Sequence, residues 1–397
     1  MNRLKDIIIW GVGLWGNIAY MYYKDTCNIR YFIDSDERKW NHKLYDIPIC
    51  SPDILLETSC YVIVAIKTGK NDVEKCLRDT YGIKEFSFFS INEEKIEPSL
   101  ISNKTSFLSV NSSVVHFRGG LGNQLFQYAF FKAQERGKKN VWADITSYNE
   151  SGRMPFQLLN VFKNIKMNFT EAEEQTKLIA SVNSYDDNKN FVLYKEPRAV
   201  VETKKIEVNI DLLKTTGGIF KGYFQTYRFA DLVKKELLSE LVFEIEKSKD
   251  LLIISNSIKE RGYTSIHIRR GDFLLEHNER YFGNICTNEY YENAMKYIQK
   301  KTGKCYFCFF SDDMKWVKEH FNIPGAMYID KTMFSDYQDW YDMYLMSICK
   351  HNIIANSTFS WWGAWLNQNP DKTVIAPNKW VNGCEYEDIY PPEWMKM

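Results

Sequence analysis

Short apolar runs, each followed by a helix-like stretch, recur along the whole chain, and this alternation constrains the fold more than any other feature. Within residues 5–90 the runs are "IIIW", "IRYFID", "YVIVAI" and "EFSFFS". A second series begins with "VVHF" at 114–117 and continues to the C-terminus. Strands that alternate with helices form parallel sheets covered by helices. The sequence therefore predicts an α/β protein.

The two series of strands suggest how the domains are divided. With 397 residues the chain is long enough for two or three domains. The polar stretch at 92–113, around Pro98, is typical of a linker and the start of a new domain. We expect an N-terminal domain over 1–98, a linker over 99–113, and a second α/β region from 114 to the C-terminus.

Composition excludes several classes of partner. The 51 basic and 51 acidic residues balance, so nucleic acid is not expected and a phosphate site must be a local cluster. No leader peptide is evident, and no apolar run reaches the ~18–20 residues that span a bilayer. We expect a cytoplasmic protein, with peripheral association at the inner face of the membrane left open.

Cysteine usage points to reduced thiols. The nine cysteines are odd in number and scattered along the chain. The one Cys-x-x-Cys pair, Cys305 and Cys308, lies in the apolar run "CYFCFF". A strand directs these two side chains to opposite faces, so a buried strand is favoured over a metal or redox site.

The segment "IIIWGVGLWGN" (7–17) has the pattern of a dinucleotide-binding turn. An acid suited to bind a ribose follows at the end of the next apolar run. The Tyr-x-x-x-Lys matches at Tyr20…Lys24 and Tyr297…Lys301 are badly placed for a nicotinamide enzyme. We therefore expect an accessory ligand site or a scaffold, and the candidate residues are Gly11, Gly13, Gly16 and Asp34.

In the second region, polar residues follow several apolar runs at the point where a helix begins. Ligands of open parallel sheets bind outside the carboxyl ends of the strands, where helix N-termini offer backbone N–H groups. The segment "TSIHIRRGDF" delivers His267, Arg269 and Arg270 to such a place. We expect Arg269 to meet phosphate oxygens and Arg270 to pair with an acid such as Asp272. A purely structural Arg270–Asp272 pair is the alternative.

The run "CYFCFFSDD" ends in Asp312 and Asp313. One of these acids is expected to cap the following helix, and the other to contact a ribose or guanine. In "NIIANSTFSWWGAWLN", the hydroxyls of Ser357 and Thr358 and the first N–H groups of a helix would form a cradle for a diphosphate.

The aromatic residues of the same stretch have a different expected role. Three tryptophans follow one another at helical spacing, and at least two of them are expected to pack in the core rather than stack on a sugar. They are Trp361, Trp362 and Trp365.

A fourth strand–turn–helix unit opens the second region, "VVHFRGGLGNQLFQYAFFKAQERG" (114–137). It is not a Walker loop, because no Gly-Lys-Ser/Thr follows. Its glycines, Gly120 among them, allow a ligand to approach the backbone. Asn123 and Gln124 are its hydrogen-bonding side chains, and the helix is expected to end near Gly137.

Taken in order, "GGLGNQLFQYAF", "HIRRGDF", "FSDD" and "NSTFSWWGAWL" resemble the motif set of glycosyltransferase family 11, the α-1,2-fucosyltransferases. The resemblance covers about residues 114–397, and its long first and last motifs make it specific. The second motif usually ends in Tyr, where this chain has Phe273. The resemblance implies a GT-B fold of two Rossmann-like lobes, over 114–255 on the acceptor side and over 256–397 on the GDP-fucose side. It also implies inverting transfer of L-fucose from GDP-β-L-fucose, with no metal or cofactor, to the 2-hydroxyl of a terminal β-galactoside.

The resemblance also implies roles for individual residues. Arg269 would hold the diphosphate, and Asn123 would lie near the breaking bond. The general base stays open among Asp272, Glu276 and His277. Together with the argument from strand ends, the substrate-binding candidates are His267, Asp312, Asp313, Asn356, Ser357, Thr358, Phe359, Gly120 and Gln124.

The N-terminal domain resembles the small Rossmann-like modules that bind nucleotides or CoA in bacterial polysaccharide enzymes.

Two further interpretations of the function remain beside a transferase for bacterial surface glycans or O-antigen. A Rossmann epimerase or dehydrogenase would leave "HIRRGDF" and "NSTFSWWGAWL" without a role. A non-catalytic sensor of sugar nucleotides is the third interpretation. The irregular stretch 150–255, expected to form the acceptor side, carries no recognisable motif.

Overall fold

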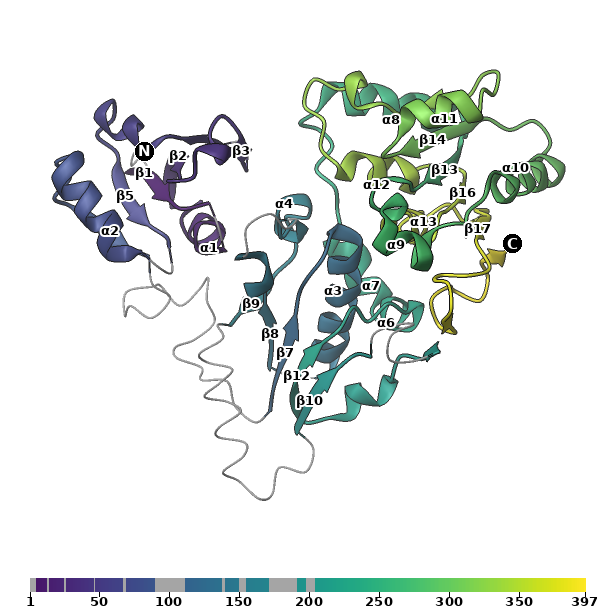
Figure 1. The fold of residues 1–397 in the computed structure, drawn as a ribbon, viewed down its shortest axis with the longest axis horizontal. Coiled ribbons are helices and arrows are strands. Elements are labelled where there is room, and N and C mark those ends of the chain that lie inside the picture. Colours follow the sequence, from purple (N-terminus) through teal and green to yellow (C-terminus); the bar gives the residue numbers. More distant parts are fainter. Residues whose placement is uncertain are drawn as a thin grey trace. The chain divides into compact units, whose positions relative to one another are not determined.

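The computed structural model describes residues 5–12, 14–24, 26–45, 47–66, 69–89, 111–137, 140–149, 155–170, 191–197 and 204–397 (Figure 1). The chain forms two compact units, Met1–Ser109 with Ile145–Arg153 and Val110–Asp144 with Met154–Met397. Residues 99–110 of the predicted linker 99–113 lie outside the described residues.

The first unit is built on a sheet with the strand order β3-β4-β2-β1-β5-β6. All neighbouring strands are parallel except β3 and β4. All four apolar runs predicted within residues 5–90 form strands of this sheet. Its elements are β1 (Lys5–Trp10), α1 (Leu14–Tyr23), β2 (Cys27–Ile33), β3 (Lys43–Leu44), β4 (Ile47–Cys50), β5 (Tyr61–Val64), α2 (Lys70–Lys75) and β6 (Phe86–Phe88).

The second unit begins with a parallel five-stranded sheet of order β10-β12-β7-β8-β9. The buried helix α3 packs on this sheet and ends at Gly137, as predicted. The elements are β7 (Ser112–His116), α3 (Leu121–Arg136), β8 (Asn140–Asp144), α4 (Leu158–Val161), β9 (Asn168–Phe169), β10 (Phe191–Lys195), β11 (Lys205–Ile206), β12 (Gly217–Lys221), α6 (Tyr227–Leu232) and α7 (Lys234–Glu240).

The C-terminal part contains a parallel six-stranded sheet of order β15-β14-β13-β16-β17-β19. Its elements are α8 (Lys249–Arg261), β13 (Thr264–Ile268), α9 (Glu276–Phe282), α10 (Asn288–Thr302), β14 (Phe307–Ser311), α11 (Met314–His320), β15 (Met327–Tyr328), α12 (Trp340–Ser347), β16 (His351–Ile353), α13 (Thr358–Trp365), β17 (Val374–Ala376), β18 (Glu385–Tyr386) and β19 (Met395–Lys396).

The order of this last sheet has a functional consequence. The chain proceeds outward from β13 to β14 and β15, and then returns to lay β16 on the other side of β13. Sheets wound in this way bind ligands in the crevice outside the carboxyl ends of the strands where the order reverses. The reversal falls between β13 and β16. These are the strands that precede "RRGD" and "NSTF".

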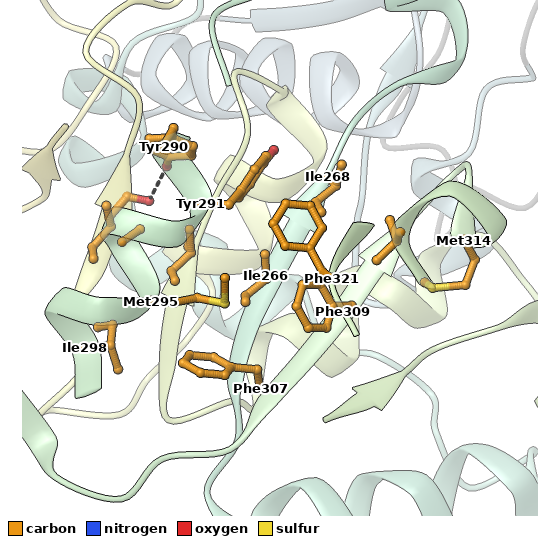
Figure 2. Close-up of a cluster of buried hydrophobic side chains, with 14 residues drawn as sticks. Ile266, Ile268, Tyr290, Tyr291, Met295, Ile298, Phe307, Phe309, Met314 and Phe321 are labelled. Atoms are coloured by element: carbon orange, nitrogen blue, oxygen red, sulfur yellow. Dashed lines mark hydrogen bonds between the residues drawn. The ribbon is translucent and has the colours of Figure 1, made fainter. Parts of the chain in front are cut away.

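Alternation along β14 explains how both faces of this sheet are covered. Phe307 and Phe309 pack with α10 and α11 on one face, a cluster that Figure 2 shows around Tyr291. Cys308 and Phe310 pack with α8 and α12 on the other. A strand that is buried on both faces has a continuous apolar sequence, which accounts for "CYFCFF". The α/β prediction is thus confirmed, with parallel sheets throughout the second unit.

The tryptophans of α13 lie in the core, as predicted. Trp361, Trp362 and Trp365 are each at most 4% exposed, and Phe126 of α3 packs against the first two. Among the described helices, none is both long and apolar enough to cross a membrane.

Candidate functional site

The carboxyl ends of β13 and β16 bring two of the predicted motifs together. The strands are parallel neighbours, with Thr264 paired to His351 and Ile266 to Ile353. The chain leaves β13 into Arg269 and Arg270, and it leaves β16 into the segment that precedes α13. Because both strands end at the same edge of the sheet, the arginines and the start of α13 lie at the same switch point.

Arg269 is held by two carboxylates. Its Nη2 donates to Oδ1 of Asp272 at 2.6 Å, and its Nη1 lies 2.8 Å from Oδ2 of Asp312. The Arg269 side chain is still 33% exposed, so a ligand can reach the guanidinium group. Asp272 is about half exposed, and an anionic ligand would compete with this carboxylate for the guanidinium N–H groups.

The expected pairing of Arg270 with Asp272 is wrong. Arg270 donates through Nε to Oδ2 of Asp313 at 3.1 Å, and its guanidinium carbon lies 3.8 Å above the Trp316 ring. The reason is local backbone geometry. Because β13 ends at Ile268 and Arg270 has φ −127° and ψ −69°, strand alternation no longer applies to the arginine pair.

The two acids after β14 divide their tasks. Asp313 caps α11, since its Oδ1 accepts from the backbone N–H of Trp316 at 3.2 Å. This bond, together with Arg270, keeps the pKa of the Asp313 carboxyl below its usual value. Asp312 instead accepts from the backbone N–H of Arg270 at 2.9 Å and pairs with Arg269. One acid is therefore the expected cap, while contact of Asp312 with a nucleotide stays a prediction.

His267 lies buried beneath the arginines. Burial, reinforced by the positive charge of Arg269, lowers the pKa of His267 to about 3, so the imidazole is neutral at physiological pH. Its Nδ1 has no hydrogen-bond partner among the described residues, and its ring centroid lies 6.1 Å from that of Phe359. Contact of His267 with a ligand stays a prediction.

The start of α13 provides backbone N–H groups. Ser357 occupies the N-cap position in an extended conformation, and its side chain makes no capping hydrogen bond. Thr358 and Phe359 form the first turn, where N–H groups have no partner within the helix. Hydroxyls and N–H groups are thus gathered beside the carboxyl end of β13, as the diphosphate cradle requires.

A glycine on α3 allows the two helices to approach each other closely. A Cβ atom on Gly122 would lie 2.6 Å from Oγ1 of Thr358 and 2.7 Å from the backbone nitrogen of Phe359. Such distances are too short for any side chain. Gly122 therefore allows the first turn of α3 to pack against the first turn of α13. Asn123 is the next residue of α3 and belongs to the same turn.

The neighbouring glycines shape the turn before α3. Gly119 has φ +82°, a conformation that other residues rarely adopt, and Gly120 is the N-cap of α3. Contact of Gly120 with a ligand stays a prediction.

Gln124, one of the candidate ligand residues, is fully occupied by hydrogen bonds within the protein. Buried Gln124 donates to the carbonyls of Gly119 and Pro155 and accepts from two backbone N–H groups, of Gln157 and Leu158. The role expected for Gln124 is corrected accordingly, because no capacity of its amide remains for a substrate.

Buried Asn356 is in a similar position. Its Nδ2 donates to the carbonyls of Phe282 and Trp380, and its Oδ1 accepts from the thiol of Cys286. Asn356 thus fixes the segment before α13. Contact of Asn356 with a substrate stays a prediction.

The remaining candidates for a general base lie at the surface. Asp272 follows the arginines, and Glu276 and His277 are exposed in the first turn of α9. Asp272 is already paired with Arg269, and none of the three is brought into contact with Asn123 by a described hydrogen bond. The base is therefore not assigned.

In the first unit, the glycine turn is a packing device. Gly11 has φ +112°, and a Cβ on Gly16 would lie 1.8 Å from the Gly11 carbonyl oxygen, so α1 packs directly on the turn. Asp34 accepts from the N–H groups of Val12 and Asp36 and pairs with Lys39 at 3.0 Å. Its carboxylate is thus occupied within the unit. Gly13 lies outside the described residues.

Metal-ligating side chains are not clustered in the described part of the chain, where no group of three or more His, Cys, Asp or Glu residues could hold an ion. All nine cysteines are free thiols. Cys308 lies buried in β14, as expected, and Cys305 precedes that strand.

Sequence analysis missed two residues of this region. Gln225 bridges Asn123 and Trp380 with one hydrogen bond of 2.9 Å to each. Gln225 follows β12 and Trp380 follows β17, so a search of every strand exit for polar or aromatic residues would have found both.

Comparison with known proteins agrees with this arrangement. Residues 211–397 match the model of glycosyl transferase family 11. The O-antigen biosynthesis glycosyltransferase WbnK of Escherichia coli is 31% identical over 302 residues, which cover 70% of this chain and 98% of that protein. An alpha-1,2-colitosyltransferase of Escherichia coli is 30% identical over 296 residues, 72% of this chain and 98% of that protein.

A more distant relative is the human galactoside alpha-(1,2)-fucosyltransferase 1, which is 29% identical over 138 residues, 34% of this chain and 36% of that protein. These similarities, together with the α/β fold and the strand-exit site, define a glycosyltransferase. The chain belongs to glycosyltransferase family 11.

Proposed function

We propose that the protein is an inverting α-1,2-fucosyltransferase, which moves L-fucose from GDP-β-L-fucose to the 2-hydroxyl of a terminal β-galactoside. The observation that carries this proposal is the junction of three motifs at one switch point. Arg269 follows β13, α13 follows the neighbouring strand β16, and the first turn of α3 packs against the first turn of α13. The names of the family relatives support the transferred sugar and the linkage.

Stabilisation of the departing GDP is the main chemical task in glycosyl transfer. Negative charge develops on the diphosphate as the bond to the sugar breaks, and fixed donors aimed at that charge lower the barrier. Arg269 is suited to this role because its planar fork can reach two phosphate oxygens. The N–H groups of Thr358 and Phe359 and the hydroxyl of Ser357 would hold the remaining oxygens.

The same site can bind the nucleoside and the sugar. Neutral His267 offers its unpaired Nδ1 at the base of the site. Asp312 would accept from the N–H edge of guanine or from a ribose hydroxyl, and Asn123 would lie beside the fucose and the breaking bond. We propose that these residues, with no metal or further cofactor, suffice for transfer.

Domain organisation belongs to the same proposal. We infer a small Rossmann-like domain over 1–98, a linker over 99–113, and a GT-B transferase with an acceptor-side lobe over 114–255 and a donor-side lobe over 256–397. The two parallel sheets of the second unit support this division. The pairing of β11 with β18 joins the two halves.

The biological setting follows from the relatives. Because one relative is named as an O-antigen biosynthesis enzyme, we propose a galactose-terminated surface glycan of bacteria as the acceptor. Activated sugars are made in the cytoplasm, so we place the enzyme there, with contact to the inner face of the membrane through its glycan acceptor.

An accessory nucleotide at Gly11, Gly16 and Asp34 would have to displace Lys39 from the Asp34 carboxylate.

A donor panel tests the proposed function. Purified protein is incubated with lactose and, in separate reactions, GDP-fucose, GDP-colitose, GDP-mannose or UDP-galactose, and GDP or UDP release is measured. We expect release of GDP from GDP-fucose that depends on lactose. A faster reaction with GDP-colitose would support the second candidate, a colitosyltransferase, which the name of one relative favours. Reduction of NAD in a parallel reaction that contains it, without sugar transfer in any reaction, would contradict both.

A further inference from the structure

Gln225 lies between two side chains that come from distant parts of the chain. Its Nε2 donates to Oδ1 of Asn123 at 2.9 Å, and its Oε1 accepts from Nε1 of Trp380 at 2.9 Å. These partners are 102 and 155 residues away in sequence. Asn123 belongs to the first turn of α3, whereas Trp380 follows the last strands of the C-terminal sheet.

The chemistry of the indole group fixes the direction of this chain of hydrogen bonds. An indole N–H can only donate, so Trp380 must be met by the carbonyl oxygen of the Gln225 amide. The NH2 group of Gln225 then faces Asn123, so Asn123 must accept with its own carbonyl oxygen. The Trp380 indole thereby fixes the orientation of both amides, in which the oxygen and the NH2 group could otherwise be exchanged. The NH2 group of Asn123 is the part of this amide that Gln225 leaves to other partners.

The backbone around Gln225 is held in an unusual conformation. Phe224 has φ +52°, which is rare for a residue with a bulky side chain. Half-buried Glu196 stabilises this turn, because its Oε2 accepts from the N–H groups of Tyr223 and Phe224. On the other side, Thr226 caps α6. A strained turn that is fixed on both sides gives Gln225 a defined position.

The chain of hydrogen bonds ends at the candidate site on both sides. Asn123 follows Gly122, whose backbone packs against the first turn of α13. At the other end, the carbonyl of Trp380 accepts from Nδ2 of Asn356 at 3.2 Å, and Asn356 directly precedes Ser357 and Thr358. Gln225 thus connects the loop of α3 with the loop that carries the proposed diphosphate cradle.

We propose that Gln225, oriented by the Trp380 indole, is a positioning residue that presents the NH2 group of Asn123 as a hydrogen-bond donor to an oxygen of the reacting sugar nucleotide. This inference rests on the proposed function of the same site. It specifies a polarity: the Asn123 amide meets the substrate with its NH2 group, because its carbonyl oxygen is turned toward Gln225. The polarity is testable, because a carboxylate in place of the Gln225 amide would reverse it.

The variant Gln225→Glu tests the polarity through pH. An ionised carboxylate has no hydrogen to donate, so it would draw the Asn123 NH2 toward itself and turn the Asn123 oxygen to the substrate. We expect kcat about 100-fold below wild type at pH 8.5, the scale of losing one oriented donor. A protonated carboxyl can donate to Asn123 and accept from Trp380 as the amide does. The ratio of variant to wild-type kcat should therefore rise as the pH falls toward 5.5.

The ratio isolates the introduced group, because wild type carries all other titratable groups nearby. The charged and titratable groups on the segments around Gln225 include Arg118, Glu196, Tyr223, Tyr227, Arg228, Lys379, Asp388 and Tyr390. Affinity for GDP, which the C-terminal sheet and α13 would bind, should be unchanged in Gln225→Glu. A loss confined to kcat separates positioning from general damage to the fold.

A pair of tryptophan variants provides the second test. Trp380→Phe removes the indole N–H. We expect kcat to fall about tenfold, because the hydrogen bond that orients Gln225 is lost and one such bond corresponds to about this factor in rate. Trp365→Phe is the matched control, since buried Trp365 also donates its indole N–H, to Asp231 at 3.0 Å, and has no bond to Gln225. This control should keep the wild-type rate. If Gln225→Glu does not fold, the comparison of Trp380→Phe with Trp365→Phe tests the proposal by itself.

The outcomes distinguish this inference from the proposed function. If wild type transfers no fucose in the same assay, the proposed function fails. If wild type is active and the Gln225→Glu rate ratio is independent of pH, or if Trp380→Phe and Trp365→Phe behave alike, the positioning role is overturned.

Discussion

At the scale of single residues, Asp272 decides how much of the Arg269 charge is available to a ligand. The exposed pair of Asp272 and Arg269 would be broken when a diphosphate binds. We therefore expect Asp272→Asn to tighten GDP binding two- to fivefold, which corresponds to the ~0.5–1 kcal/mol of an exposed ion pair. Isothermal titration with GDP measures this. Unchanged GDP affinity together with a large fall in kcat would instead assign the general base to Asp272.

His267 gives a second prediction at this scale. Burial and the Arg269 charge lower its pKa to about 3, so the ring stays neutral as the pH falls from 8 to 5. The unfolded chain takes up a proton near pH 6.5, and the stability that the buried neutral ring contributes is therefore lost as the pH falls below that value. In a histidine-labelled sample, the ring resonances that disappear in His267→Gln should not shift over this range. A titration midpoint near 6.5 would contradict burial of the ring.

At the scale of elements, the close approach of α3 and α13 depends on Gly122. A methyl group at this position would meet Thr358 and Phe359 at less than 3 Å, so the first turn of one helix must move. We expect Gly122→Ala to weaken GDP binding and to lower the unfolding free energy by about 1–3 kcal/mol, as overpacking does.

The control for this prediction is Gly137→Ala at the other end of α3, where the glycine has an ordinary φ of −72°. Calorimetric GDP titration and urea denaturation of both variants provide the comparison. Equal effects of the two substitutions would refute a specific contact between α3 and α13.

The same scale shows how far the sequence predicts this site. Apolar runs such as "TSIHI" and "CYFCFF" identify buried strands, and the rule that parallel sheets bind ligands at their carboxyl ends then locates Arg269, Asp313 and Ser357. The partners of the arginines could not be predicted, because side-chain alternation ends with the strand at Ile268. The occupation of Gln124 by Pro155 and Gln157 likewise depends on backbone that is distant in sequence.

At the scale of the whole molecule, contacts over more than a hundred residues complete the site. The positions of Gln225 and Trp380 after strands mark them as candidates, but the bridge from Asn123 through Gln225 to Trp380 depends on contacts between segments that are distant in sequence. The curated relatives WbnK and the colitosyltransferase are matched over nearly their full lengths by 70% and 72% of this chain. The matched part of this chain therefore corresponds to nearly the whole of each relative, and the rest of this chain lies outside the match.

The central claim is that this site transfers fucose to the 2-hydroxyl of galactose with inversion. The most direct measurement is the NMR spectrum of the product formed from GDP-β-L-fucose and lactose, with Arg269→Ala run in parallel. We predict an α-fucosyl group on O2 of galactose, and a loss of rate of about 100-fold or more in the variant. A β-linked product, attachment at another hydroxyl, or near-normal transfer by Arg269→Ala would contradict the account.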